Sequence, residues 1–219
     1  VFEDKIIKNQ FSTKNVYESI KNLKTVGIIA EEEGGKVLKI AAPMGVICAL
    51  VPSTNPTSTA MFKVLISLKS RNAIVASPHP RTAKCTAEAL QILSDAAEKA
   101  GAPKGLIQCM SEHTIEGTDA LMSDKNIAVI LATGSTPMVK AAYSAGKPAF
   151  GVGSGNVPAF IERSANYHKA VGDIIYGTTF DNGTLCSSEQ SMIVDLPLKE
   201  KVIEETKLQG CYFVNAEEK

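Results

Sequence analysis

The chain has 219 residues, of which 44% are hydrophobic, so it can bury a core as one large domain or two small ones. Its 23 basic and 23 acidic residues give a formal net charge of zero. This balance excludes an overall field that would attract nucleic acid or an anionic membrane, and we expect a globular protein with a small-molecule partner.

The first predicted element is an amphipathic helix over 12–24, because its apolar residues recur at spacings of four and three. Its N-cap is expected at Ser12 or Thr13. Two β-like runs follow at 26–30 and 36–41, and the glycines between them suit a tight reversal. We therefore predict a β-hairpin near 26–41.

From Gly45 onward, short and continuously apolar runs alternate with longer segments of helical periodicity. Such runs suit strands that are buried on both faces. The strands are expected at 46–51, 73–77, 106–110 and 127–132, and the helices between them at 57–70, 81–100 and 115–124. This alternation predicts right-handed βαβ units, so the expected fold class is α/β with a Rossmann-like parallel sheet and flanking helices.

A fifth helix is predicted to begin within 133–146, with Thr136 as its N-cap. The Gly- and Pro-rich stretch 148–160 marks a boundary between two regions, 1–150 and 151–219. The second region is expected to begin another α/β unit, with a helix at 164–177, a strand at 191–195 and a helix at 197–209.

The five cysteines are widely spaced and form neither a CxxC pair nor a zinc-type cluster, so we expect reduced thiols and no metal. No apolar run approaches the roughly 18–20 residues that span a bilayer. No cleavable signal is found, although the chain begins at Val1 and a lost leader would not be visible. We expect a cytoplasmic protein that contacts neither nucleic acid nor membrane.

Ligands of a doubly wound sheet bind outside the carboxyl ends of its strands, and four loops there carry unusual residues. The loop 52–58 presents Asn55 between two prolines, where its amide could donate to a developing oxyanion. The alternative is an ordinary turn and helix cap. The loop 77–82 holds His79, which could bind a ribose or a phosphate, or could simply be exposed.

The loop 134–139 joins a buried strand to a helix N-terminus, whose N–H groups and positive dipole suit a pyrophosphate. It lacks the GxGxxG spacing, and an ordinary βα loop would look similar. In the fourth loop, Cys186 lies among small polar residues after a turn at 181–183. A thiol beside backbone N–H donors can have a lowered pKa and react as thiolate, whereas a structural cysteine is the alternative.

These loops, in this order, resemble those of the aldehyde dehydrogenase superfamily over nearly the whole chain. The matching segments are PMGV from Pro43, VPSTNP from Val51, SPHP from Ser77, TGST from Thr133 and the loop around Cys186. The resemblance implies the aldehyde dehydrogenase fold, with a nicotinamide cofactor-binding region at 1–150 and the first part of the catalytic region at 151–219.

The resemblance also implies roles for individual residues. Cys186 would be the catalytic nucleophile, and Asn55 would donate to the oxyanion. NAD or NADP would be held by Pro52, Ser53, Thr54, Ser77, Pro78, His79, Pro80, Gly134, Ser135, Thr136, Gly151, Val152 and Gly153.

Departures from the family pattern indicate a particular branch. Hydrolytic members place a glutamate before a Gly-Gly-Lys segment, where it activates the deacylating water, and here Gly151 stands at that position. Ser77 replaces a ribose-binding lysine and Pro80 replaces a glutamate, so the choice between NAD and NADP is open. This pattern resembles the CoA-acylating branch.

The implied reaction converts an aldehyde, CoA and NAD(P)⁺ to acyl-CoA and NAD(P)H, and the reverse, through a thioester on Cys186. The resemblance implies a homo-oligomer assembled through the hairpin, in the cytoplasm or in a bacterial microcompartment. It leaves the aldehyde open.

Two alternatives stay open. One is a hydrolytic dehydrogenase that releases free acid, with its base supplied by Glu162 or Glu189. The other is a non-catalytic nucleotide-binding module in which Cys186 is incidental. The family's full domain is much longer than this chain, so we expect a fragment that is inactive by itself.

Overall fold

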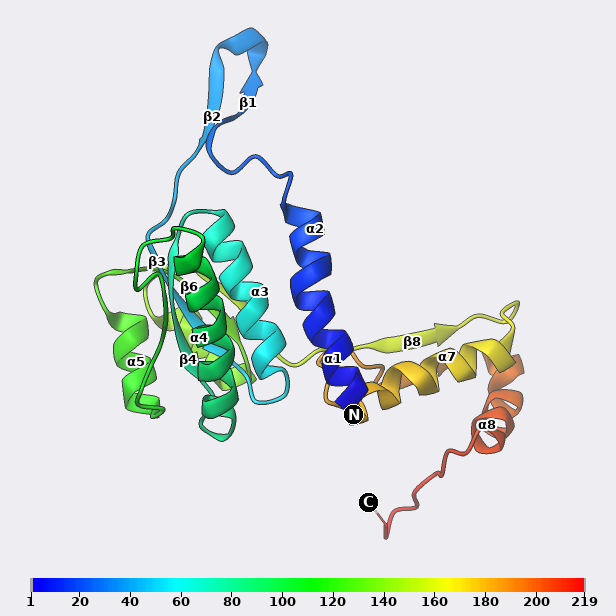
Figure 1. Ribbon diagram of the computed structural model, residues 1–219. Coiled ribbons are helices and arrows are strands. Elements are labelled where there is room, and N and C mark those ends of the chain that lie inside the picture. Colours follow the sequence, from blue (N-terminus) through cyan, green and yellow to red (C-terminus); the bar gives the residue numbers. More distant parts are fainter. Residues whose placement is uncertain (1, 219) are drawn as a thin grey trace. The chain divides into compact units, whose positions relative to one another are not determined.

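The computed structural model describes residues 2–218 (Figure 1). They form two compact units, which meet in sequence between Ser154 and Gly155 and are described separately below. The assignment of cofactor binding and catalysis to two regions of the chain stays a prediction.

The larger unit is built on a five-stranded parallel sheet with the strand order β5-β4-β3-β6-β7. Its strands are β3 (Val46–Val51), β4 (Ala73–Pro78), β5 (Ile107–Cys109), β6 (Ile127–Thr133) and β7 (Ala149–Val152). The chain winds from β3 to one edge and then from β6 to the other. The predicted doubly wound α/β fold is confirmed, although β7 was assigned to a Gly- and Pro-rich boundary.

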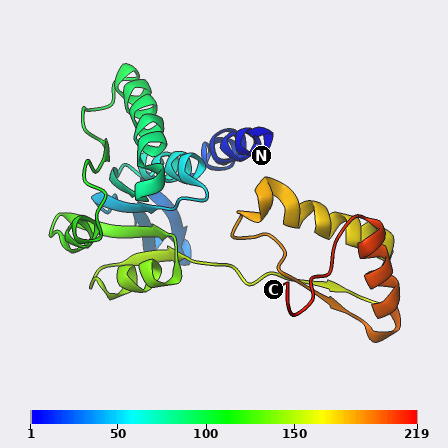
Figure 2. The same cartoon turned by 90° about the horizontal axis from the view of Figure 1, so that it is seen from below.

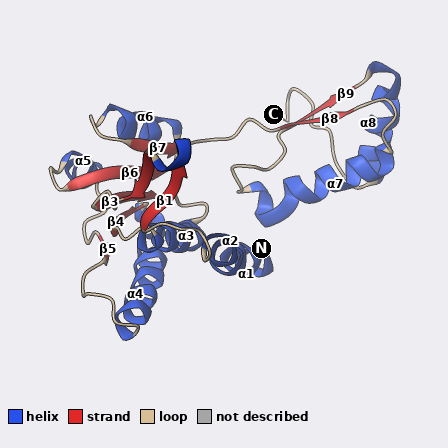
Figure 3. Cartoon of the chain, turned by 90° about the horizontal axis from the view of Figure 1, so that it is seen from above, coloured by secondary structure: helices blue, strands red, loops and turns tan. Residues whose placement is uncertain are grey.

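Helices cover both faces of this sheet: α3 (Pro56–Lys69) and α4 (Ala83–Lys99) on one, and α5 (Ile115–Ser123) and α6 (Thr136–Ser144) on the other (Figure 3). Alternate residues of β3 pack into the cores on the two faces of the sheet, because successive side chains of a strand point in opposite directions. Ala49 belongs to the same core as Val64 of α3, whereas Leu50 belongs to the core that contains Ala142 of α6. Burial on both faces explains the continuous apolar runs.

The first described residues are helical and form α1 (Phe2–Gln10), a π-helical turn (Phe11–Asn15) and α2 (Val16–Ile20). The predicted N-cap at Ser12 or Thr13 is wrong, because both residues lie inside this helical segment. The Thr13 hydroxyl donates to the backbone carbonyl of Asn9, 2.8 Å away, and so bonds within the helix and caps nothing.

The predicted hairpin is confirmed as β1 (Gly27–Glu32) and β2 (Val37–Ala41), an antiparallel pair that forms a sheet of its own (Figure 1). Gly34 and Gly35 take positive φ angles of 67° and 89° in the turn, which glycine adopts at little cost.

The smaller unit pairs two parallel strands, β8 (Pro158–Ile161) and β9 (Ser191–Val194), with α7 (Tyr167–Thr179) and α8 (Lys199–Leu208). Figure 2 shows α7 in yellow and α8 in red-orange beside these strands. Ile161 of β8, Val171 of α7 and Val202 of α8 share one core. The helices and β9 were predicted, whereas β8 was not.

No helix within residues 2–218 is long and apolar enough to cross a membrane.

Candidate active site

The switch point of the larger sheet lies between β3 and β6, from which the chain winds in opposite directions. Loops that leave such neighbouring strands diverge, and the crevice between them is the usual ligand site of this architecture. The loop after β3 carries Asn55, and the loop after β6 carries Gly134, Ser135 and Thr136.

Backbone hydrogen bonds join the predicted loops at this edge of the sheet. The N–H of His79, after β4, donates to the carbonyl of Val51 at the end of β3, over 3.0 Å. The N–H of Gly134, after β6, donates to the carbonyl of Val152 on β7, over 3.1 Å. The structure therefore brings the predicted residues of four strand ends to one edge.

Asn55 occupies the N-cap position of α3, but its side chain makes no capping hydrogen bond. Its Nδ2 donates only to the Thr54 hydroxyl over a long 3.3 Å, and its buried Oδ1 has no hydrogen-bond partner among the described residues. An unsatisfied buried acceptor costs about 1–3 kcal/mol. Helix capping therefore does not explain this asparagine, and one Nδ2 hydrogen remains for a substrate.

Helix α1 holds the Asn55 loop on both sides. Nζ of Lys5 donates to the Thr54 carbonyl over 2.9 Å, and the Thr57 hydroxyl donates to Oδ1 of Asn9 over 2.8 Å. Neither contact could be predicted from the sequence pattern, because no helix was expected before residue 12.

Lys63 of α3 is buried beneath the switch point, with 3% of its surface exposed. Its Nζ donates to the carbonyls of Leu50 on β3 and Leu131 on β6, over 2.6 and 2.7 Å. Burial lowers the pKa of Lys63 to about 7, against a smaller opposite effect of Cys48. The amine can keep both hydrogen bonds when neutral, because an NH₂ group has two donors.

The pKa of Lys63 predicts how stability varies with pH. Between about 7 and 10.5 the unfolded chain holds the lysine proton and the folded chain does not, so stability rises with pH. Above pH 9 the buried Cys48, whose pKa burial raises to about 12, has the opposite effect. Lys63→Met should therefore remove a rise of about 2 kcal/mol between pH 7 and 9.

Urea denaturation of the wild type and the Lys63→Met variant between pH 6 and 9 measures this difference. Lys69→Met is the matched control and keeps the wild-type slope, because the Lys69 ammonium lies at the exposed end of the same helix. Parallel curves for wild type and Lys63→Met would contradict the prediction.

At the carboxyl end of β4, the Ser77 hydroxyl shares a 2.8 Å hydrogen bond with that of Thr118 on α5, and both side chains are buried. Ser77 therefore anchors β4 to α5. His79 is exposed, and its Nδ1 accepts from the Arg81 N–H over 3.2 Å, which leaves Nε2 available to a ligand. Pro78 is buried, and Pro80 is exposed.

Helix α6 begins at Thr136, so the N-cap is Ser135 and the predicted cap at Thr136 is wrong by one residue. Proline is tolerated throughout the first helical turn, so Pro137 is compatible with an N-cap at either Ser135 or Thr136. The Ser135 side chain makes no capping hydrogen bond. The N–H groups of the first turn are thus left for an anion such as a diphosphate.

Cys186 is exposed, in the loop that leads from α7 to β9 of the smaller unit. The prediction that this loop follows a strand of the doubly wound sheet is therefore wrong. The turn predicted before it is confirmed, because Asp181, Asn182 and Gly183 take successive φ angles of 51°, 54° and 65°. Asp and Asn tolerate this left-handed conformation better than other side chains. The buried Asp181 carboxylate accepts from the Thr184 hydroxyl over 2.8 Å, which fixes the loop from inside.

Gly155 lies directly against the backbone of Cys186. A Cβ atom built on Gly155 would lie 2.1 Å from the Cys186 carbonyl oxygen, so only glycine fits. Gln190 completes this contact, because its Nε2 donates to the Gly155 carbonyl over 3.0 Å and its N–H donates to the Val157 carbonyl over 2.9 Å. Neither Gly155 nor Gln190 was among the predicted site residues.

The other cysteines differ from Cys186 in their environment. Burial raises the pKa of Cys48 to about 12 and also raises the pKa of Cys109, which disfavours thiolate at both. Cys85 is exposed on α4, and Cys211 is half-buried. Within the described part of the chain, no group of three or more His, Cys, Asp or Glu side chains could hold a metal ion.

The two glutamates considered as alternative bases lie in the smaller unit. Oε2 of Glu162 accepts hydrogen bonds from the hydroxyl and the N–H of Ser164, and these bonds lower the pKa of Glu162 and weaken it as a base. Glu189 packs against Gly177 of α7, and its buried Oε2 has no hydrogen-bond partner among the described residues.

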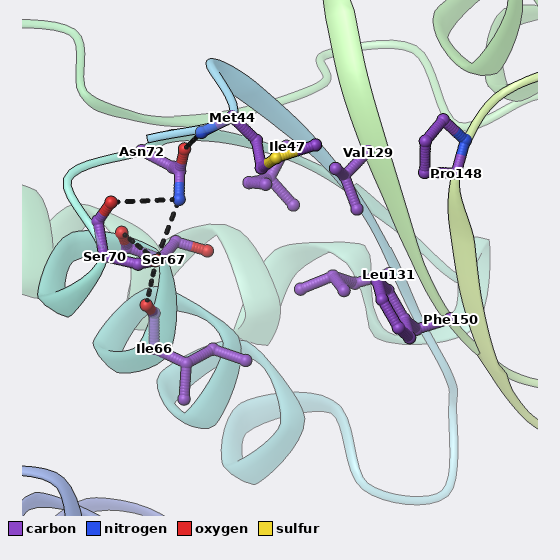
Figure 4. Close-up of a pocket in the computed structure, with 10 residues that line it drawn as sticks. All are labelled: Met44, Ile47, Ile66, Ser67, Ser70, Asn72, Val129, Leu131, Pro148 and Phe150. Carbon is purple, nitrogen blue, oxygen red and sulfur yellow. Dashed lines mark hydrogen bonds between the residues drawn. The ribbon is translucent and has the colours of Figure 1, made fainter. Parts of the chain in front are cut away.

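A separate apolar pocket of about 330 Å³ lies between α3 and the strands β3, β6 and β7 (Figure 4). Met44 and Asn72 precede β3 and β4, so this pocket lies toward the amino ends of the strands. Asn72 lines this end of the pocket, and its Oδ1 accepts hydrogen bonds from the N–H groups of Met44 and Gly45. None of the predicted site residues lines this pocket.

A doubly wound sheet with an uncapped helix N-terminus beside its switch point is the arrangement of many nucleotide-binding α/β proteins, and in this chain a cysteine-bearing unit follows it. Residues 9–209 match the family model described as "Aldehyde dehydrogenase family". The chain belongs to the aldehyde dehydrogenase family, as its loops predicted.

Relatives of the chain are similar over most or all of it. The aldehyde-alcohol dehydrogenase of Streptococcus pneumoniae is 49% identical over 100% of this chain and 25% of that protein. An acetylating aldehyde dehydrogenase from Geobacillus thermoglucosidasius, known from its crystal structure, is 58% identical in sequence to this chain. The two structures superimpose with a TM-score of 0.93, over 98% of this chain and 48% of the other.

The crystal structure of a Rhodopseudomonas palustris propionaldehyde dehydrogenase, with bound CoA and an acylated cysteine, is 34% identical with a TM-score of 0.76. That match covers 80% of this chain and 40% of the other. The chain thus spans about a quarter to a half of the length of these relatives.

Proposed function

We propose that the protein containing this chain is a CoA-acylating aldehyde dehydrogenase, which forms acyl-CoA and NAD(P)H from an aldehyde, CoA and NAD(P)⁺ and also catalyses the reverse. The observation that carries this proposal is the glycine at 151, the position at which the loop resemblance implies a glutamate in hydrolytic members. Without a base there, an acyl-enzyme thioester should survive until a thiol arrives. The acylated cysteine and bound CoA of the Rhodopseudomonas palustris relative support the same course.

In the proposed reaction, the Cys186 thiolate attacks the aldehyde carbonyl carbon and forms a C–S bond. Nδ2 of Asn55 and the N–H of Cys186 donate to the resulting oxyanion. The nicotinamide, when bound, accepts the hydride that leaves this carbon. The thioester on Cys186 is then attacked by the CoA thiol, which loses its proton as Cys186 leaves as thiolate.

Residues of the larger unit fit the cofactor chemically. The uncapped first turn of α6 offers N–H groups to the diphosphate, beside Ser135 and Thr136. His79 offers its exposed Nε2 to a ribose or phosphate. Gly153 leaves room for a close approach, since a Cβ built on it meets nothing nearer than 3.9 Å.

We also propose a homo-oligomer that assembles through the β1–β2 hairpin, in the cytoplasm. The exposed apolar side chains of Ile28, Val37 and Ile40 on this isolated two-stranded sheet support a protein interface.

The deciding experiment is a substrate panel on the full-length protein, with and without CoA and with either NAD or NADP. Acetaldehyde, propionaldehyde, succinate semialdehyde and sulfoacetaldehyde are the aldehydes to compare. We expect reduced cofactor and acyl-CoA to form together, and only when CoA is present. Rapid release of free acid without CoA would eliminate the acylating proposal, and failure of every aldehyde would favour a non-catalytic role.

A further inference from the structure

Helix α6 approaches β7 so closely at Gly151 that a side chain does not fit there. A Cβ atom built on Gly151 lies 2.4 Å from Cγ1 of Val139 and 2.9 Å from Cε2 of Tyr143. Non-bonded carbon atoms normally stay about 3.5–4.0 Å apart. Val139 is β-branched and has essentially one rotamer in a helix, so the overlap can be relieved only by moving the helix or the strand.

Tyr143, one helical turn after Val139, fixes Gly151 from the same side. Its hydroxyl accepts a hydrogen bond from the Gly151 N–H over 2.9 Å and lies 3.0 Å from the built Cβ. β7 is an edge strand with β6 as its one partner among the described strands, and this N–H is satisfied by the Tyr143 side chain. Moving the Tyr143 ring to admit a side chain would therefore break the bond that completes the edge.

We propose that Val139 and Tyr143 are acceptor-specificity residues, which fill the side-chain position of residue 151 and so exclude a carboxylate base from it. This inference rests on the proposed function. In hydrolysis, the base removes a proton from water as the water oxygen attacks the thioester carbonyl carbon. The C–S bond then breaks, Cys186 leaves as thiolate, and a carboxylic acid forms. The preference for CoA over water as acyl acceptor thus depends on Gly151, Val139 and Tyr143 together, and a substitution of Gly151 alone cannot reverse it.

The steric part is tested by Gly151→Ala in the full-length protein, alone and combined with Val139→Ala. Gly151→Ala should lower Tm by a few degrees, and Val139→Ala should restore part of this loss, because Cγ1 of Val139 is the nearest obstacle and the Tyr143 ring remains. Lys140→Ala, at the next and exposed position of α6, is the matched control and should restore nothing. A Gly151→Ala variant with the wild-type Tm would overturn the proposal.

The functional part compares Gly151→Glu alone, with Val139→Ala, and with Lys140→Ala, by measuring free acid released from propionaldehyde and NAD⁺ without CoA. The Val139→Ala/Gly151→Glu variant should release acid on the order of 10²-fold faster than wild type, within the range for a general base. Val139→Ala/Gly151→Gln, which has no base, should not. Neither Gly151→Glu nor its Lys140→Ala combination should gain this activity.

Three results of this comparison would overturn the inference while leaving the proposed function intact. The first is equal acid release by Gly151→Glu with and without Val139→Ala. The second is a Val139→Ala/Gly151→Glu variant that does not fold, and the third is a folded variant that releases acid no faster than its glutamine counterpart. Failure of the proposed function has a different signature, because the wild type itself would then release acid rapidly without CoA.

Discussion

Cys186→Ala in the full-length protein should reduce CoA-dependent NAD(P)H formation by at least about 10³-fold, since removal of a nucleophile leaves only binding and electrostatic contributions. The loss should fall on kcat, because the thiol forms its bond to the substrate during the chemical step. Initial rates measured with saturating aldehyde and CoA give this number directly.

Cys85→Ala is the matched control, because Cys85 is also an exposed thiol, but on α4 and bonded to the Thr82 carbonyl. It should keep wild-type rates. Mass spectrometry after incubation with aldehyde and NAD⁺ should find the acyl group on the peptide that contains Cys186. An acyl group on any other cysteine, or an active Cys186→Ala variant, would refute the assignment.

Asn55→Ala should lower kcat by about 10²–10³-fold, which corresponds to about 2.7–4 kcal/mol for one lost oxyanion donor. KM should change little, because the interaction strengthens only as negative charge develops on the substrate oxygen. The Asn55 side chain does not cap α3, so its removal should cost little stability. Thermal denaturation of the variant checks this last point.

Asn55→Asp provides a stricter version of the same test, because it keeps the shape of the side chain and replaces the donor with an acceptor. It should be at least as inactive as Asn55→Ala. Asn126→Ala, an exposed asparagine before β6, is the matched control and should keep full activity. A kcat within a few-fold of wild type for Asn55→Ala would exclude oxyanion binding by this residue.

The sheet was predictable because each strand that is buried on both faces needs an uninterrupted apolar run, which is visible in the sequence at 46–51 and 127–132. The edge strand β7 and the strand β8 have four residues each and contain glycine or proline, so AFGV and PAFI resemble loop. The helix start was misplaced because Ser12 and Thr13 favour caps, while in this chain they continue the helix.

Contacts between segments distant in sequence could not be predicted. Lysine is almost never fully buried, so nothing in the α3 pattern separated Lys63 from the exposed lysines. The obstruction of residue 151 by Val139 depends on how closely α6 approaches β7, which no residue spacing records. Three of the four loops could be found because parallel strands place their carboxyl ends at one edge, whereas the loop of Cys186 follows α7 in the smaller unit and was found from its polar residues and its turn.

The contact of Gly155 with the Cys186 carbonyl determines where this protein could be divided into two polypeptides. A cut between Ser154 and Gly155 would leave the thiol loop on the same piece as the glycine it rests on and the Gln190 that holds that glycine. A cut only a few residues later would separate them and deprive the cysteine-bearing piece of its support. A design that splits the protein into two polypeptides should therefore place the cut before Gly155.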